Sequence, residues 1–402
     1  MREQIAAVDP QAAQRAVGAS IVRTPTLRCD ELSELAHTPT ALKAECMQVT
    51  GSFKLRGALN KLAALGGRAS AGVVTASAGN HARAVAQAAR LRGVACEVFM
   101  PADAAVSKLA AVERLGARVH VEGDSIEQAL HSAGAWAERS GATLVHPFDD
   151  LDVIAGQATL ALELLEDVPD VARVIVPVGG GGLASGVGIA LRRARAEVEL
   201  IGVQARACAP LLGALAGDAP AAPTGATVAD GIAVKRPGEI TLPLLRELLD
   251  GIETVTEDEI ADAIVFLAER AKLVAEGAGA VAAALLMRGE LGAREGPTVA
   301  IVSGGNIDSG LLSGLLLRHE TELGRRVRIF TRVPDRPGGL AELLASIARA
   351  RANVVSVEHV REAVPLAVRE TGVELTLETR GPGHTAEVLA ALRSDGYDVT
   401  TG

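Results

Sequence analysis

The spacing of apolar and polar positions predicts alternating strands and helices over most of the chain. Short apolar runs rich in Val and Ile are typical of buried strands, and apolar residues three and four apart are typical of amphipathic helices. The expected strands lie at 73–77, 94–101, 118–123, 171–178, 198–205 and 297–305, and the expected helices at 80–93, 125–141 and 183–195. This alternation predicts an α/β fold with two parallel-sheet units.

The pattern changes after residue 326, where strands and helices follow in another order. The expected elements there are strands at 327–335, 353–361 and 372–381 and helices at 340–351 and 385–394. This succession indicates a separate module of the βαββαβ type. We therefore expect two domains, one at 1–320 and one at 326–402.

Composition narrows the class of protein. The chain has 402 residues, of which 49% are hydrophobic and 2% aromatic, and its formal net charge is −9. Cores must pack through Ala, Leu and Val, and the negative charge with few aromatic platforms argues against nucleic acid as a partner. The N-terminus has charges and a proline where a signal peptide has its apolar core, and no apolar run is long enough to span a bilayer. We expect a cytoplasmic protein without a membrane partner.

One lysine stands where a helix is expected to begin. The segment TGSFKLRGALNKL, residues 50–62, places Lys54 at the start of an amphipathic pattern, with Ser52 or Thr50 as the expected helix cap. A cation at a helix N-terminus is disfavoured, and if Lys54 is also desolvated its pKa falls towards neutrality and its amine becomes a nucleophile. The alternative is a lysine that points into water.

A four-glycine run follows the apolar segment at 171–178, in the sequence VIVPVGGGGLASG. Glycines allow close backbone approach, and amides at the mouth of a helix can bind a phosphate. The alternative is a flexible turn. A dinucleotide fold is a weaker candidate: Gly179, Gly181 and Ala184 fit a loose G-x-G-x-x-A pattern, but Gln204 stands where the ribose needs an acid.

The segment SAGNH, residues 77–81, also lies between an expected strand and an expected helix. Its amides and the Ser77 hydroxyl can bind a small anion such as a carboxylate, and Asn80 can donate to a phenolic oxygen. The alternative is an ordinary helix-capping sequence.

Taken together, these motifs resemble the pyridoxal-phosphate enzymes of fold type II, which have a fold like that of the tryptophan synthase β subunit. Within them, the order and spacing resemble the threonine ammonia-lyases, also called threonine dehydratases. Further matching segments are RTP at 23–25, HPFDDLDVIAGQAT at 146–159, ADGIAV at 229–234, EGAGA at 276–280 and SGGN at 303–306.

The resemblance implies a role for each motif. Lys54 is the expected catalytic residue, which binds the aldehyde of pyridoxal 5'-phosphate covalently and later removes the α-proton of the substrate. The other expected cofactor contacts are Phe53, Asn80, Gly179, Gly180, Gly181, Gly182, Leu183 and Ser303. The expected substrate contacts are Ser77, Ala78, Gly79, Asn80, His81 and Glu276. L-Threonine would then give 2-oxobutanoate and ammonia, and L-serine would give pyruvate.

Some positions depart from the family pattern. Ala78 stands where the serine racemase branch has a serine as the acid and base on the opposite face, which favours an ammonia-lyase. Gln204 and Pro210 replace the acids of that branch's divalent metal site, so no metal is expected. Arg83 replaces the Gln that is common in relatives. Serine dehydration, hydroxyaspartate elimination, racemisation and a catalytically silent amino-acid sensor remain alternatives, with a nicotinamide enzyme more distant.

The C-terminal module resembles an ACT domain, the small amino-acid sensor. By that resemblance an effector, isoleucine or valine, would regulate the enzyme, consistent with a role in isoleucine biosynthesis. The alternative is a dimerisation module without a ligand, and the resemblance implies a homodimer or homotetramer. The expected effector contacts are Asp335, Gly338, Gly339, Leu340 and Asn353.

Overall fold

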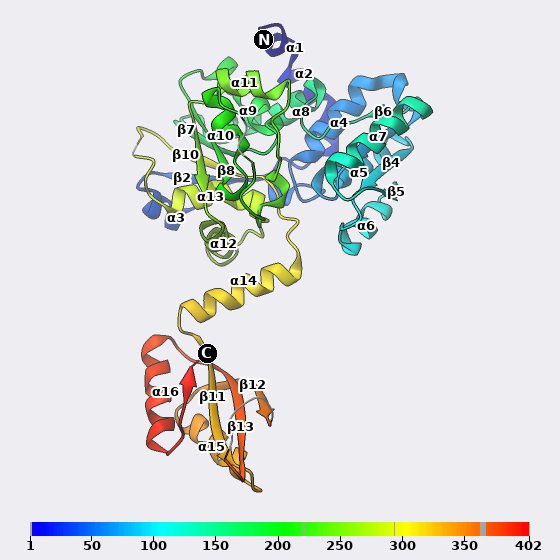
Figure 1. The fold of residues 1–402 in the computed structure, drawn as a ribbon. Coiled ribbons are helices and arrows are strands. Elements are labelled where there is room, and N and C mark those ends of the chain that lie inside the picture. Colours follow the sequence, from blue (N-terminus) through cyan, green and yellow to red (C-terminus); the bar gives the residue numbers. More distant parts are fainter. Residues whose placement is uncertain (1, 220–221, 293, 362–366, 402) are drawn as a thin grey trace. The chain divides into compact units, whose positions relative to one another are not determined.

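Two α/β lobes, each built around one sheet, make up the first of two compact units, residues 1–308 (Figure 1). The second unit covers residues 309–402. The structure is a computed structural model and describes residues 2–219, 222–292, 294–361 and 367–401. None of the helices in these ranges is long and apolar enough to cross a membrane.

The small lobe contains a parallel sheet with the strand order β5-β4-β3-β6. Its strands are β3 (Val73–Ala76), β4 (Cys96–Met100), β5 (Arg118–Val121) and β6 (Thr143–Leu144), and its helices are α4 (Lys54–Leu65), α5 (Asn80–Arg92), α6 (Val106–Glu113) and α7 (Ile126–Ser140). The periodicity had indicated all of these except α6 and β6, which have weak or very short apolar patterns.

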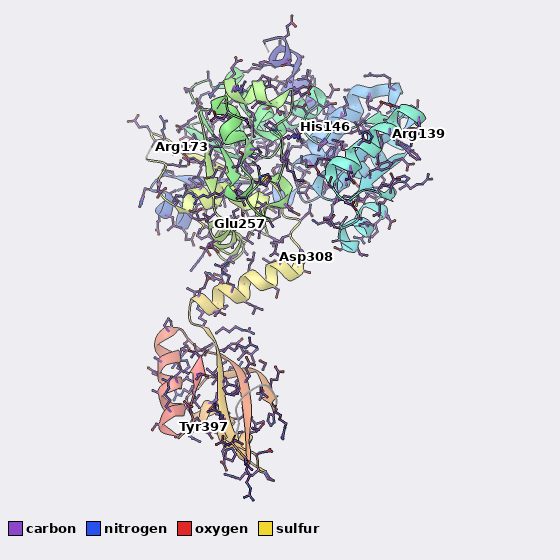
Figure 2. All side chains as sticks on the ribbon, in the orientation of Figure 1. Arg139, His146, Arg173, Glu257, Asp308 and Tyr397 are labelled. Atoms are coloured by element: carbon purple, nitrogen blue, oxygen red, sulfur yellow. The ribbon has the colours of Figure 1, made fainter. Side chains whose placement is uncertain are left out.

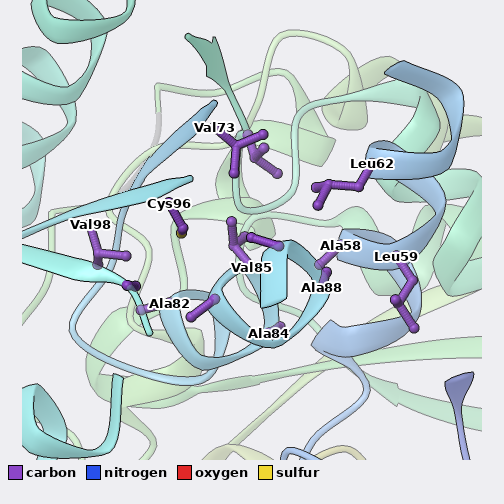
Figure 3. Packing of buried hydrophobic residues seen from close by; sticks show 14 of the residues in the cluster. Ala58, Leu59, Leu62, Val73, Ala82, Ala84, Val85, Ala88, Cys96 and Val98 are labelled. Atoms are coloured by element: carbon purple, nitrogen blue, oxygen red, sulfur yellow. The ribbon is translucent and has the colours of Figure 1, made fainter. Parts of the chain in front are cut away.

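Small aliphatic side chains fill the core of this lobe. Ala82, Val85 and Ala88 of α5 are buried in one cluster with Leu62 of α4 and Val73 of β3 (Figure 3). Alanine lets neighbouring elements approach closely, and the longer aliphatic side chains fill the remaining space. The expectation that Ala, Leu and Val form the cores is confirmed here.

The large lobe contains a sheet with the strand order β1-β2-β10-β7-β8-β9. All neighbouring strands are parallel except β1, which runs antiparallel to β2 at the edge. The strands are β1 (Thr26–Arg28), β2 (Thr40–Ala44), β7 (Arg173–Pro177), β8 (Glu199–Ala205), β9 (Gly251–Val255) and β10 (Thr298–Val302). The prediction of an α/β fold with two parallel-sheet units is therefore confirmed, with one antiparallel edge strand added.

Helices from several parts of the first unit complete the large lobe. The N-terminal helices α1 and α2 precede the first strand, and α8 and α9 pack closely on each other. The helices are α1 (Arg2–Ala7), α2 (Pro10–Val17), α3 (Asp30–Ala36), α8 (Leu151–Asp167), α9 (Gly182–Ala194), α10 (Pro210–Ala216), α11 (Thr241–Leu248), α12 (Glu257–Phe266) and α13 (Gly277–Met287).

A buried ion network ties α4 to the large lobe. The Arg56 guanidinium on α4 lies 2.8 Å from a Glu45 carboxylate oxygen next to β2 and 2.7 Å from a Glu163 oxygen on α8. The Lys43 ammonium on β2 lies 2.9 Å from Glu163. Arg56, Lys43 and Glu45 are fully buried. Burial raises the pKa of Glu45, but the Arg56 charge and its hydrogen bonds outweigh burial and hold that pKa below its usual range.

Helix α4 begins at Lys54, where the pattern placed it, but the predicted side-chain cap is wrong. Phe53 occupies the cap position and makes no side-chain capping bond. The hydroxyls of Ser52 and Thr50 have no hydrogen-bond partner among the described residues. The backbone of Ser52 instead pairs with Gly304 in an isolated antiparallel bridge, which fixes the entry to the helix by a contact from another part of the chain.

The C-terminal unit has the expected βαββαβ order after one leading helix. Its antiparallel sheet has the order β12-β13-β11-β14, and Ile329, Leu343 and Leu375 lie in its buried core. The elements are α14 (Ser309–Glu322), β11 (Arg326–Pro334), α15 (Gly339–Arg349), β12 (Asn353–Val360), β13 (Glu370–Glu378), α16 (Pro382–Ser394) and β14 (Thr400–Thr401).

The close contact between α4 and α8 predicts that replacement by alanine changes stability in opposite directions at two helical glycines. A Cβ added at Gly156 of α8 would lie 2.4 Å from the Arg56 carbonyl oxygen, whereas one added at Gly134 of α7 meets no atom within 4 Å. We expect Gly156→Ala to destabilise the protein by about 2 kcal/mol or more through overpacking. Gly134→Ala should stabilise it by about 0.5–1 kcal/mol through helix propensity. Urea unfolding followed by circular dichroism tests both, and equal effects would contradict the close approach.

Candidate active site

Lys54 lies at the first position of α4, and its surroundings change its chemistry. Its side chain is partly buried, and its Nζ donates to the Pro147 carbonyl at 2.9 Å. The Nζ also lies 5.1 Å from the centre of the Phe53 ring. Desolvation lowers the pKa of Lys54 to about 8, although the negative charge of Glu276 acts in the opposite direction. About a tenth of the amine is therefore neutral at pH 7, far more than for a lysine with the usual pKa of 10.5.

The glycine run forms a tight loop between β7 and α9. Gly181 has φ +96°, a left-handed conformation that favours glycine, and α9 begins at Gly182. A Cβ at Gly180 would lie 2.3 Å from the Phe148 ring, and one at Gly179 would lie 3.0 Å from the Cα of Ile232. Only glycine fits these positions without movement of its neighbours. The loop presents the first amides of a thirteen-residue helix, where an anion is favoured.

Pro147 and Phe148 bring Lys54 and the glycine loop into one site. These residues belong to the connection between β6 of the small lobe and α8 of the large lobe, which also contains His146, labelled in Figure 2. Pro147 accepts the hydrogen bond of Lys54, while the next residue packs against Gly180. Lys54 and the glycine loop are thus held by adjacent residues of a single segment.

Ser303 lies beside the entry to α4. Its carbonyl accepts a hydrogen bond from the Phe53 amide at 3.1 Å, and its buried hydroxyl donates to the Ala278 carbonyl at 3.2 Å. The SGGN motif therefore contacts the Ser52–Phe53 segment directly. Phe53, Lys54 and Ser303 are brought together, as the sequence resemblance implies.

Asn80 and Glu276 form the centre of a polar network. The Asn80 amide nitrogen donates to Glu276 at 2.5 Å, and its oxygen accepts from the Asn306 amide at 2.7 Å. Arg83 donates to the oxygen of Asn306 at 2.6 Å. Burial and, after it, the charge of Asp230 raise the pKa of Glu276 to about 7, although the bond from Asn80 acts to lower it. This carboxyl therefore changes charge near neutral pH.

Sequence reasoning missed Asn306 and Arg83 as parts of this network. The SGGN motif contained Asn306, but nothing in its spacing showed that the side chain would reach α5. Arg83 is one helical turn after Asn80 on α5, a spacing that places both on the same face of the helix. That spacing was the available signal for Arg83.

The SAGNH segment lies between β3 and α5, as expected, but part of it is already bonded. The Ser77 hydroxyl accepts from the Gly79 amide at 3.1 Å, so this amide is engaged within the loop. His81 is buried, its Nε2 donates to the Val145 carbonyl, and its Nδ1 has no partner among the described residues. Burial, followed by the Lys54 charge, lowers the pKa of His81 to about 3, so the ring is neutral. Ala78 adds no polar group.

Gln204 has a structural position in the large lobe. Its side chain is buried, donates to the Val178 carbonyl at 3.1 Å and accepts from the Leu211 amide at 3.1 Å. It therefore holds the strand that leads into the glycine loop. Because Gln204 is not an acid, this position lacks the carboxylate that binds the ribose in dinucleotide folds.

The expected effector residues lie in the second unit and are only partly together. Asp335, Gly338 and Leu340 line a cavity of about 330 Å³ at the end of β11 and the start of α15. Gly339 is not among the lining residues, and its amide donates to the Arg336 carbonyl. Asn353 does not line the cavity either, because its side chain donates to Glu378 at 2.9 Å.

The fold and the site define a two-lobed α/β protein with a lysine of lowered pKa and a glycine loop at a helix N-terminus between its lobes. A family model described as pyridoxal-phosphate dependent enzyme matches residues 17–304. The chain belongs to this family. The L-threonine ammonia-lyase of Thermotoga maritima is 44% identical over 393 residues, which cover 97% of this chain and 98% of that relative. The L-threonine ammonia-lyase of Geobacter sulfurreducens is 43% identical over 93% of this chain and 94% of its own length.

Solved structures resemble the first unit. A threonine deaminase from T.th. has a TM-score of 0.69 and 39% identity, and it covers 74% of this chain and 97% of its own. Maize serine racemase has a TM-score of 0.73 and 33% identity, and it covers 78% of this chain and 97% of its own. These neighbours, a deaminase and a racemase, therefore share one fold.

The residues present fit pyridoxal phosphate. The partly buried amine of Lys54, with its lowered pKa, suits a covalent bond to an aldehyde. The glycine loop offers helix amides for a phosphate, and the buried Ser185 hydroxyl in the first turns of α9 has no partner among the described residues. Ser303 supplies a buried neutral hydroxyl beside Phe53.

The lowered pKa of Lys54 predicts how the apoprotein takes up its cofactor. Only the neutral amine attacks an aldehyde, and desolvation moves its pKa from the usual 10.5 to about 8. The rate of covalent attachment of pyridoxal phosphate should therefore rise with pH to a midpoint near 8. Borohydride trapping followed by mass spectrometry measures this rate, with Lys54→Ala as the unlabelled control. A midpoint near 10.5 would show that Lys54 is solvated.

Proposed function

We propose that this protein is an L-threonine ammonia-lyase that uses pyridoxal phosphate to form 2-oxobutanoate and ammonia, with L-serine as a second substrate that gives pyruvate. The observation that carries the proposal is the 44% identity to the T. maritima L-threonine ammonia-lyase over 97% of the chain, which includes both units. The gathering of Lys54, Asn80, the glycine loop and Ser303 supports it.

Each group of the site has a part in this reaction. Pyridoxal phosphate, when bound, supplies the electron sink for charge that develops next to the substrate nitrogen. Gly179 to Leu183 would hold its phosphate, and Ser303 and Asn80 would contact its ring. The amides of Asn80 and His81 hold the substrate carboxylate, together with Ser77. Lys54 removes the α-proton, because its lowered pKa lets it act as a base near neutral pH.

Racemisation of serine is a second candidate, since maize serine racemase shares the fold of the first unit. Moving a proton to the opposite face of the substrate requires a second acid. Ala78 has no polar side chain to provide one. Elimination is therefore favoured over racemisation.

The proposed activity predicts a response to L-threonine that depends on Lys54. The holoprotein should absorb visible light through its bound cofactor, and L-threonine should change that absorption while 2-oxobutanoate accumulates. Lys54→Ala should lower turnover by at least about 10³-fold, because the base and the covalent anchor are both lost. Chiral chromatography of L-serine reactions measures racemisation in parallel. Absorption that does not change when L-threonine is added would contradict the proposal. So would D-serine as the main product from L-serine.

We further propose that residues 1–320 form the catalytic domain and residues 326–402 an ACT domain that binds an amino-acid effector, isoleucine or valine. The βαββαβ order and the cavity at Asp335 support this assignment. Asp335 pairs with Arg361 at 3.2 Å, and its carboxylate can instead accept from the amino group of an effector. We also propose a cytoplasmic homodimer or homotetramer.

The effector proposal predicts a selective loss of regulation. Asp335→Asn should raise the isoleucine or valine concentration needed for half of the effect at least about tenfold, because a charge-assisted hydrogen bond is lost. Glu387→Gln, at an exposed position of α16, is the matched control and should leave the response unchanged. Rate curves at several effector concentrations decide the matter. Identical curves with and without both amino acids would contradict regulation by these ligands.

A further inference from the structure

Two ion pairs join the small lobe to residues 230–235 of the large lobe, a segment that we name the strap. The Lys108 ammonium on α6 lies 3.0 Å from a carboxylate oxygen of Asp230 at one end of the strap. The Lys235 ammonium at the other end lies 3.2 Å from a carboxylate oxygen of Glu127 in the first turn of α7. Each lobe contributes one lysine and one acid. An ion pair to the small lobe therefore holds each end of the strap.

The strap lies against the active site. A Cβ added at Gly179 of the glycine loop would lie 3.0 Å from the Cα of Ile232. A Cβ added at Gly231 would lie 3.7 Å from a carboxylate oxygen of Glu276. The residue next to Asp230 therefore lies close to Glu276, and the strap lies beside both the glycine loop and the polar network.

The two members of the first pair act on Glu276 with opposite signs. Burial raises the pKa of Glu276 most, the Asp230 carboxylate raises it further, and the Lys108 ammonium lowers it. Two further titratable groups among the described residues interact with Glu276, namely Lys54 on α4 and the Cys46 thiol after β2. Neither member of the second ion pair is among the main contributions to the pKa of Glu276, although this pair holds the same strap. The chain thus contains its own matched control.

Both pairs are exposed enough to open. The side chains of Lys108 and Asp230 are 32% and 63% exposed, and those of Lys235 and Glu127 are 55% and 53% exposed. Solvent-exposed ion pairs contribute little to stability and exchange readily with water. The ion pairs around Arg56, by contrast, are buried. Weak, exposed pairs suit a contact that must open when a substrate leaves.

We propose that Lys108 and Asp230 are positioning residues of the active site, whose ion pair holds the small lobe on the strap and sets the charge that Glu276 and its partner Asn80 experience. If the small lobe closes on the substrate through this ion pair, the charges near Glu276 change when the pair forms. Closure and the protonation of Glu276 are then coupled. The inference rests on the proposed function only for its effect on threonine turnover. The geometry and the charges belong to the protein itself.

The test compares Asp230→Asn, Lys108→Gln and the control Lys235→Gln in the holoprotein. Hydrogen exchange of α6 and α7 measures how firmly the small lobe is held. The infrared band of the protonated carboxyl, assigned by its loss in Glu276→Gln, measures the titration of Glu276 without reference to catalysis. The pH profile of kcat/KM for L-threonine is recorded alongside.

All three variants should increase exchange in the small-lobe helix that loses its ion pair. The infrared midpoint of Glu276 should fall in Asp230→Asn and rise in Lys108→Gln, by roughly half a pH unit or more, and stay unchanged in Lys235→Gln. Midpoints that move in the same direction, or do not move, would overturn the proposal. Opposite shifts in a protein that does not turn over threonine would support it and refute the proposed function instead.

Discussion

The position of the reactive lysine depends on the buried ion network around Arg56. A guanidinium without access to water is costly unless charged partners satisfy it, and Glu45 and Glu163 do so at 2.8 and 2.7 Å. These partners come from the end of β2 and from α8, so the first turn of α4 is held between two elements of the large lobe. Breaking one partner would leave an uncompensated buried charge. The arrangement therefore has one stable geometry, and Lys54 lies two residues away from its centre.

Close backbone approach supports the same contact. Gly57 of α4 and Gly156 of α8 face each other so closely that no Cβ fits at Gly156 without moving the Arg56 carbonyl. Ion pairs set the register of the helices, and the glycines let them come within reach. Lys54, at the start of α4, is held in place by these contacts. The strap is held much less firmly than α4, because its ion pairs are exposed and weak.

Parallel-sheet topology explains why distant motifs meet. SAGNH follows β3, the glycine run follows β7 and SGGN follows β10, so each lies at the carboxyl end of a parallel strand. Ligands of open α/β sheets bind at these ends, where loops and helix N-termini converge. The two lobes contribute separate edges, and the segment with Pro147 and Phe148 connects them. A carboxyl that titrates near neutral pH, Glu276, lies where these edges meet.

Features that depend on neighbours along the chain could be predicted from the amino-acid sequence alone. The start of α4 at Lys54, the turn at the glycine run and the βαββαβ order all follow from local periodicity and turn chemistry, which a short window of residues expresses. Features that join distant residues could be recognised only in the folded protein. The placement of β2 beside β10, the pairing of Arg56 with Glu163 across 107 positions and the reach of Asn306 to Asn80 are of this kind. Their energies depend on burial and on partners that no local pattern encodes, and the missing side-chain cap of α4 has the same cause, since Gly304 fixes Ser52 from outside the helix.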